Sequence, residues 1–146
     1  MRKMIIDTDT ASDDAVAIVM ALQTPDIEVI GITVVAGNMP VKQASINARY
    51  SAQMCGKTPP VYDGIDTPFI RDPHRAYFFH GSDGMGEMKY PDPAQQPEAE
   101  HAVPALIRLI RANPGVELVT LGPLTNVAAA LLQAPDIVPL VSRCVM

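Results

Sequence analysis

The stretch that decides the fold is KMIIDTDTASDDAVAIVMAL, residues 3–22. It begins with a short apolar run, Lys3 to Asp7, that ends abruptly in carboxylates. Good helix formers follow at Ala15 to Leu22, before Thr24 and Pro25. The first run predicts a strand and the second segment predicts a helix. We therefore expect strand, loop and helix here, the opening unit of an α/β domain.

The remainder of the chain repeats this alternation. Nearly continuous apolarity in EVIGITVV, residues 28–35, is typical of a strand buried on both faces of a parallel sheet. Between about 65 and 97 the periodicity disappears, and prolines fix a long irregular loop around HGSDGMG at 80–86. The pattern predicts an open, mostly parallel sheet with helices on both faces. Further strands are expected at 61–62, 117–121 and 141–146, and helices at 41–54, 98–112 and 124–133.

The composition suits one soluble domain. The chain has 146 residues, of which 48% are hydrophobic and 18% charged, enough to bury a core without covalent staples. Cys55 and Cys144 are therefore expected as free thiols in a reducing cytoplasm. The start of the chain does not resemble a signal peptide, and the longest apolar run, Ala15 to Leu22, is too short for a bilayer. A net charge of -5 without a basic cluster argues against a nucleic acid polymer as partner.

Four carboxylates, Asp7, Asp9, Asp13 and Asp14, lie within eight positions after the first predicted strand. Ligands of open α/β sheets bind at this edge. An extended backbone points Asp7 and Asp9 to one side, and Asp13 and Asp14 can turn back from the start of the helix. Like charges this close repel unless a cation lies among them. Oxygen-only ligands favour Ca²⁺ or Mg²⁺ over zinc.

A simpler interpretation exists for part of this cluster. Residues 12–14 could merely cap the helix and complement its dipole. That interpretation leaves Asp7 and Asp9 unexplained, because they follow a strand where propensity disfavours aspartate. An EF-hand is excluded, since its loop would require glycine at Ser12 and glutamate at Ile18.

Four segments in order resemble the inosine-uridine preferring nucleoside hydrolases. DTDTASDDA at 7–15 is similar to the family's aspartate-rich motif, and ITVVAGN at 32–38, HGSDGMG at 80–86 and LGPLTNVAAAL at 121–131 resemble further family segments. The resemblance implies a nucleoside hydrolase-like fold with Rossmann-like topology. It also implies hydrolysis of the N-glycosidic bond of ribonucleosides to free base and ribose.

By this resemblance, Asp9 and Asp14 would hold Ca²⁺ together with the backbone carbonyl of Leu121. Asp9 would also act as the general base on a calcium-bound water, and Asp7 would be a supporting ligand. An anionic floor of this kind would stabilise the oxocarbenium-like sugar of glycoside hydrolysis.

The resemblance also implies residues that contact the substrate. Asp13 would accept a hydrogen bond from a ribose hydroxyl, and Asn38 would contact the ribose or the water. His80 would be a catalytic residue near the base, on a loop that could close over the substrate and bring a proton or a donor to the leaving base. Without the resemblance, Asn38 could be a turn residue after Gly37, and His80 an ordinary loop histidine.

Departures from the family pattern keep alternatives open. Thr10, Ala11 and Ser12 replace the proline-glycine pair and apolar residue often found within the motif. Family members are roughly twice this length, so residues 1–146 are expected to be the amino-terminal part of one such domain, apparently truncated. A complete chain would be a homo-oligomer by resemblance. One alternative is a haloacid-dehalogenase-like Mg²⁺ phosphatase with Asp7 as nucleophile and Asp9 as acid/base. The other is an inactive fragment.

Overall fold

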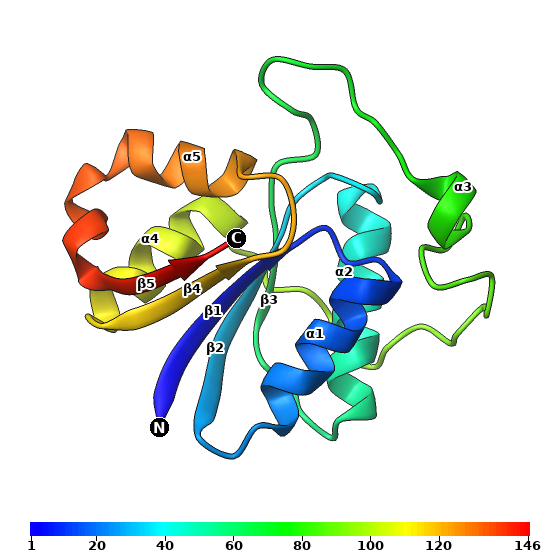
Figure 1. Cartoon of the computed structure of the whole chain (residues 1–146), viewed down its shortest axis with the longest axis horizontal. Helices are drawn as coiled ribbons and strands as arrows, with labels where there is room; N and C mark the ends of the chain where they lie inside the picture. Colours follow the sequence, from blue (N-terminus) through cyan, green and yellow to red (C-terminus); the bar gives the residue numbers. More distant parts are fainter.

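Five strands form one parallel sheet. The computed structural model describes all of residues 1–146, and the strand order is β3-β2-β1-β4-β5. Every neighbouring pair is parallel, so the predicted mostly parallel sheet is confirmed (Figure 1). The strands are β1 (Arg2–Thr8), β2 (Ile27–Val34), β3 (Val61–Asp63), β4 (Val116–Thr120) and β5 (Val141–Val145).

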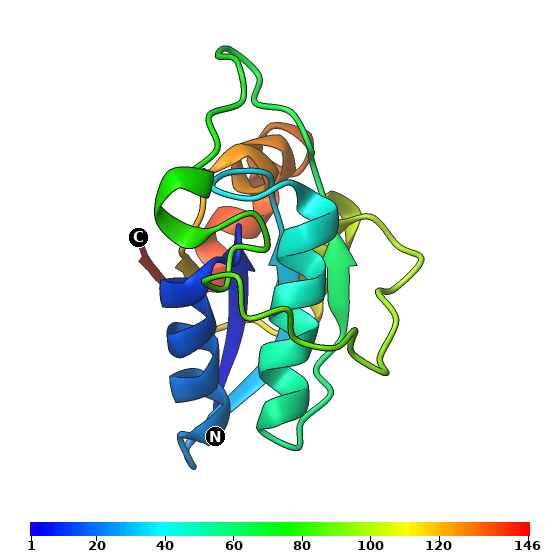
Figure 2. The ribbon, with the colours of Figure 1, turned by 90° about the vertical axis from the view of Figure 1, so that its right-hand side faces the viewer.

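Helices cover both faces of the sheet, as predicted (Figures 1 and 2). The side chains of β1 alternate between two cores: Ile5 packs with residues of α4 and α5, and Ile6 packs with residues of α1 and α2. No helix is long and apolar enough to cross a membrane. The helices are α1 (Ser12–Gln23), α2 (Val41–Met54), α3 (Tyr77–His80), α4 (Ala102–Ala112) and α5 (Thr125–Gln133), followed by a 3₁₀ helix (Pro135–Leu140).

Helix α4 begins later than the expected residue 98. The backbone N–H of Glu98 donates to the carbonyl of Val61, so this segment runs beside β3 before the helix starts. The His101 side chain then accepts a hydrogen bond from the N–H of Val103 and caps the helix. The expectation also missed α3 within the irregular loop, because four residues are too few to show a helical period.

Strand β1 lies at the point where the order of connections reverses. From β1 the chain runs outward through β2 to β3, and then returns to the other side of β1 to form β4 and β5 (Figure 1). Open α/β sheets bind ligands at the carboxyl ends of the strands next to such a reversal. This topology places Asp7 and Asp9 at that position.

Candidate functional site at the carboxyl end of strand β1

Asp7 is enclosed by side chains from both halves of the fold. It is 0% exposed, and its Oδ1 accepts hydrogen bonds from Thr33 Oγ1 at 2.6 Å and Asn126 Nδ2 at 2.9 Å. Its Oδ2 is buried without a partner. Burial raises the pKa of Asp7 to about 6, against the opposing effect of these two hydrogen bonds, and the charge of Asp9 adds to the rise.

Asp9 lies between two glycine turns, one after β2 and one after β4. A Cβ on Gly37 would lie 2.1 Å from Asp9 Oδ2, and a Cβ on Gly122 would lie 2.9 Å from Oδ1. Oδ2 accepts a hydrogen bond from the backbone N–H of Asn38, whereas Oδ1 is buried without a partner. At positions 37 and 122 only glycine leaves room for this carboxylate. Its Oδ1 has no hydrogen-bond partner within the protein.

Asp14, in the first turn of α1, turns back toward Asp9. It is 6% exposed, and its Oδ2 accepts a hydrogen bond from Thr8 Oγ1 at 2.8 Å. Burial, followed by the charge of Asp9, raises the pKa of Asp14 to about 7. Asp13 behaves differently, because its side chain is 74% exposed. Of the two helix aspartates that could turn back toward Asp7 and Asp9, Asp14 does so, whereas the Asp13 side chain is mostly exposed.

The available donor atoms are carboxylate and backbone oxygens, the type of ligand that a hard cation prefers. Asp9 and Asp14 are adjacent, buried carboxylates, and one oxygen of Asp9 is unpartnered, so a cation would relieve both repulsion and desolvation. The turn at Leu121 and Gly122 lies against Asp9, held by the hydrogen bond from Leu121 N–H to the Asp7 carbonyl at 2.8 Å. No group of three or more aspartate, glutamate, histidine or cysteine side chains is placed to hold a metal, so calcium would depend on two carboxylates and backbone oxygen.

His80 returns to this site from the irregular loop. It is buried at 6% exposure, and its Nδ1 lies 2.9 Å from Ser12 Oγ, at the start of α1. Its Nε2 lies 3.9 Å from Asp13 Oδ1. The Asn38 carbonyl accepts a hydrogen bond from the N–H of Ala76, which holds the approach to α3 over the site. The structure thus brings Asp7, Asp9 and Asp14 together at the end of β1. It sets His80 beside Ser12 and the exposed Asp13, and Asn38 reaches the site through its backbone.

Three residues of the site were missed in the sequence. Thr33 lies opposite Asp7 in the register of β1 and β2, so that register would have shown it. Asn126 is 0% exposed and donates a hydrogen bond to Asp7. The sequence feature that could have indicated it is an asparagine in the first turn of a helix that follows a buried strand. Asn47 donates through Nδ2 to the carbonyls of Thr10 and Asp83, and no local pattern marks that contact.

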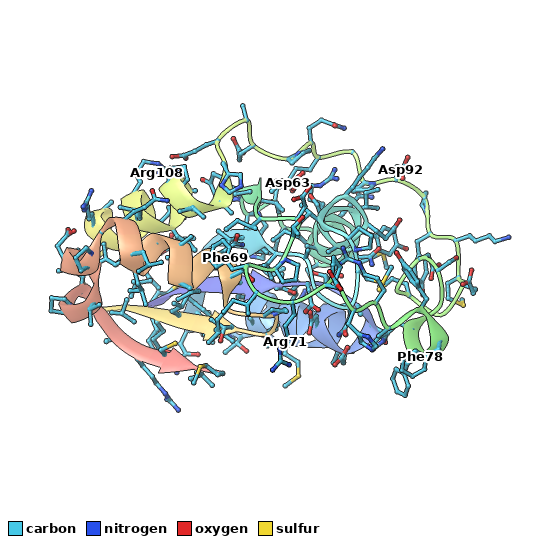
Figure 3. The ribbon with its side chains drawn as sticks, turned by 90° about the horizontal axis from the view of Figure 1, so that it is seen from above. Asp63, Phe69, Arg71, Phe78, Asp92 and Arg108 are labelled. Carbon is cyan, nitrogen blue, oxygen red and sulfur yellow. The ribbon has the colours of Figure 1, made fainter.

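The largest hollow lies elsewhere, with a volume of about 670 Å³ between α2 and two loop segments. It is lined by Arg49, Asp63 and Asp92 and contains none of the predicted site residues. Figure 3 shows Asp63 and Asp92 on the side of the molecule opposite Phe78, which belongs to α3. Asp63 Oδ1 in this hollow is also buried without a partner, but only at the end of β1 do buried carboxylates lie together, with raised pKa values for Asp7 and Asp14.

The chain is an α/β protein with an open parallel sheet and buried carboxylates at its switch point, the position at which proteins of this class bind ligands. The sequence model for inosine-uridine preferring nucleoside hydrolases matches residues 4–146, and the chain belongs to this family.

Relatives share the fold over about half of their own length. The pyrimidine-specific ribonucleoside hydrolase RihB of Escherichia coli is 37% identical over 146 residues, which cover 99% of this chain and 47% of that protein. An uncharacterised Schizosaccharomyces pombe protein is 40% identical with the same coverage. The purine-preferring ribonucleoside hydrolase from Gardnerella vaginalis superposes with a TM-score of 0.92 at 34% identity, over 98% of this chain and 47% of its own.

Proposed function

We propose that this chain carries the water-activating and ribose-binding part of a ribonucleoside hydrolase, which splits the N-glycosidic bond to give free base and ribose. The observation that supports the proposal is the buried pair Asp9 and Asp14, in which one oxygen of Asp9 has no protein partner. The free Oδ1 of Asp9 would accept the proton of the attacking water, while the Asn38 N–H holds the other oxygen in place.

Asp9, Asp14 and the Leu121 carbonyl would hold Ca²⁺, with Asp7 as a supporting ligand. When bound, the ion supplies a positive charge that orients water and the ribose diol and lowers the pKa of the water. Thr33 and Asn126 support this arrangement, because they fix one oxygen of Asp7 and leave the other unpartnered.

The remaining site residues would contact the substrate, each according to its place and exposure. Asp13 is exposed at the start of α1 and would accept a hydrogen bond from a ribose hydroxyl. Asn38 would contact the ribose from the turn after β2. His80 would face the base, since its loop crosses the same edge of the sheet. The anionic side chains beneath the sugar would stabilise the positive charge that develops on the ribose.

The phosphatase alternative does not agree with this geometry. A nucleophilic carboxylate must reach a phosphorus atom, yet Asp7 is 0% exposed and one of its oxygens is held by Thr33 and Asn126. The second alternative is a chain that binds calcium but hydrolyses nothing. It is supported by the small donor set, in which no three acidic, histidine or cysteine side chains are placed to hold a metal.

The test is release of free base from inosine and uridine, with and without millimolar Ca²⁺. We expect Asp9→Asn to abolish release and Asp26→Asn, an exposed aspartate at the opposite edge of the sheet, to leave it unchanged. Equal rates for Asp9→Asn and the unsubstituted chain would refute the assigned base. Release of phosphate from a monoester, without release of base, would refute the proposed reaction.

A further inference from the structure

The short helix α3 buries its histidine and exposes its three aromatic side chains. Its three aromatic residues, Tyr77, Phe78 and Phe79, are 45%, 85% and 76% exposed, whereas His80 is 6% exposed. Figure 3 shows Phe78 projecting away from the body of the protein. A loop packed only for stability would bury phenylalanine before histidine, because apolar burial is the larger gain. The inward position of His80 therefore indicates a polar role.

Both ring nitrogens of His80 face the first turn of α1. Nδ1 lies 2.9 Å from Ser12 Oγ, and Nε2 lies 3.9 Å from Asp13 Oδ1. A carboxylate has no hydrogen to donate, so Asp13 favours the form of the neutral ring in which Nε2 carries the hydrogen. In that form Nδ1 would accept a hydrogen bond and the Ser12 hydroxyl would donate it. Ser12 does not cap its own helix, so its hydroxyl is free for this bond.

The backbone around His80 is held independently of Ser12. The amide of Asn47 donates to the carbonyl of Thr10 at 3.0 Å and to the carbonyl of Asp83 at 2.9 Å, which ties the aspartate loop to the histidine loop. The N–H of Gly86 donates to the carbonyl of His80 at 2.8 Å and closes the turn. The position of the loop is therefore held by contacts other than the one between Ser12 and His80.

We propose that Ser12 is a positioning residue that holds His80 with its Nε2–H directed beside Asp13, ready to donate a hydrogen bond to an acceptor atom of the nucleoside base. This assignment rests on the proposed function for its substrate. The contact between Ser12 and His80 does not depend on turnover, because it exists in the chain without substrate.

The decisive measurement is the tautomer of His80, read from long-range ¹H–¹⁵N spectra of the full chain at a pH of about 8, where an ordinary histidine is neutral. His80→Gln identifies its signals among those of the three histidines. We expect the Nε2–H form in the unsubstituted chain, a mixture of both forms in Ser12→Ala, and recovery of the single form in Ser12→Thr. Ser82→Ala, which removes a hydroxyl bonded to Glu87 in the same loop, should leave the spectrum unchanged.

An unchanged tautomer in Ser12→Ala would overturn the proposal, whether or not the chain is a hydrolase. With base release measured, Ser12→Ala should lower kcat/KM by about five- to tenfold, the effect of losing one neutral hydrogen bond, and Ser12→Thr should restore it. An altered tautomer with unchanged kcat/KM would refute the role of Ser12 in the reaction. Absence of base release from every variant would refute the proposed function, while the spectra would still decide whether Ser12 controls His80.

Discussion

Replacing Asn126 by leucine should destabilise the chain by about 3–5 kcal/mol. Asn126 is 0% exposed, and its Nδ2 donates to Asp7 Oδ1 and to the Val34 carbonyl, each at 2.9 Å. Its Oδ1 accepts the N–H of Ile65 at 3.0 Å. Leucine is of similar size but makes none of these bonds. A buried bond to a neutral group contributes about 1 kcal/mol and one to a charged group about 1.5–3 kcal/mol, which gives the estimate.

Urea unfolding followed by circular dichroism measures this loss. With a denaturant dependence of about 2 kcal/mol per molar urea, the midpoint should fall by roughly 2 M. Gln133→Leu is the matched control, because it exchanges an exposed amide on the same helix for leucine and should change stability by less than about 0.5 kcal/mol. A loss below about 1 kcal/mol in Asn126→Leu, with an unchanged urea dependence, would refute the view that this amide holds the site together.

Three further predictions concern the site and its loop. Ca²⁺ at 100 times its Kd should stabilise the folded chain by about 2.7 kcal/mol and so raise its melting temperature in scanning calorimetry. Asp14→Asn should abolish this rise in melting temperature. Burial opposes the effect, but hydrogen bonds from backbone N–H groups lower the pKa of Asp83. The ionised Asp83 carboxylate therefore stabilises the fold above the ordinary aspartate pKa, and this stabilisation is lost as the pH falls through the lower pKa of the folded chain. The protection of the loop amides 80–89 against exchange, taken relative to the intrinsic exchange rate at each pH, should thus fall on acidification, and Asp83→Asn should remove that dependence. Gly122→Ala should cost about 1–3 kcal/mol in urea unfolding, because its Cβ would lie 2.9 Å from both the backbone N and Oδ1 of Asp9; unchanged stability would show that the turn can move aside.

The sequence predicted the features that depend on local pattern. Strand β2 and helix α2 were located to within a residue or two, because continuous β-branched residues and a glycine stop are local signals. The position of the aspartate motif directly after the first strand was also predicted, and β1 does end at Thr8 within that motif. The contacts of Asn126 and Asn47 could not be predicted, since each joins segments far apart in the chain. The outward direction of Asp13 likewise depends on how α1 meets the loop at His80.

The two glycine turns around Asp9 have a consequence for engineering. Besides the neighbouring Asp14, main chain crowds this carboxylate, because the Asn38 N–H binds one oxygen and the spaces beside both oxygens admit no Cβ at Gly37 or Gly122. Recoding the exposed charges to shift the net charge of -5 would therefore alter solubility while leaving the local field at Asp9 nearly intact, since surface charges are screened by salt. In a saturation library, Gly37 and Gly122 should tolerate almost no replacement, whereas the solvent-facing surface of α1 should accept many.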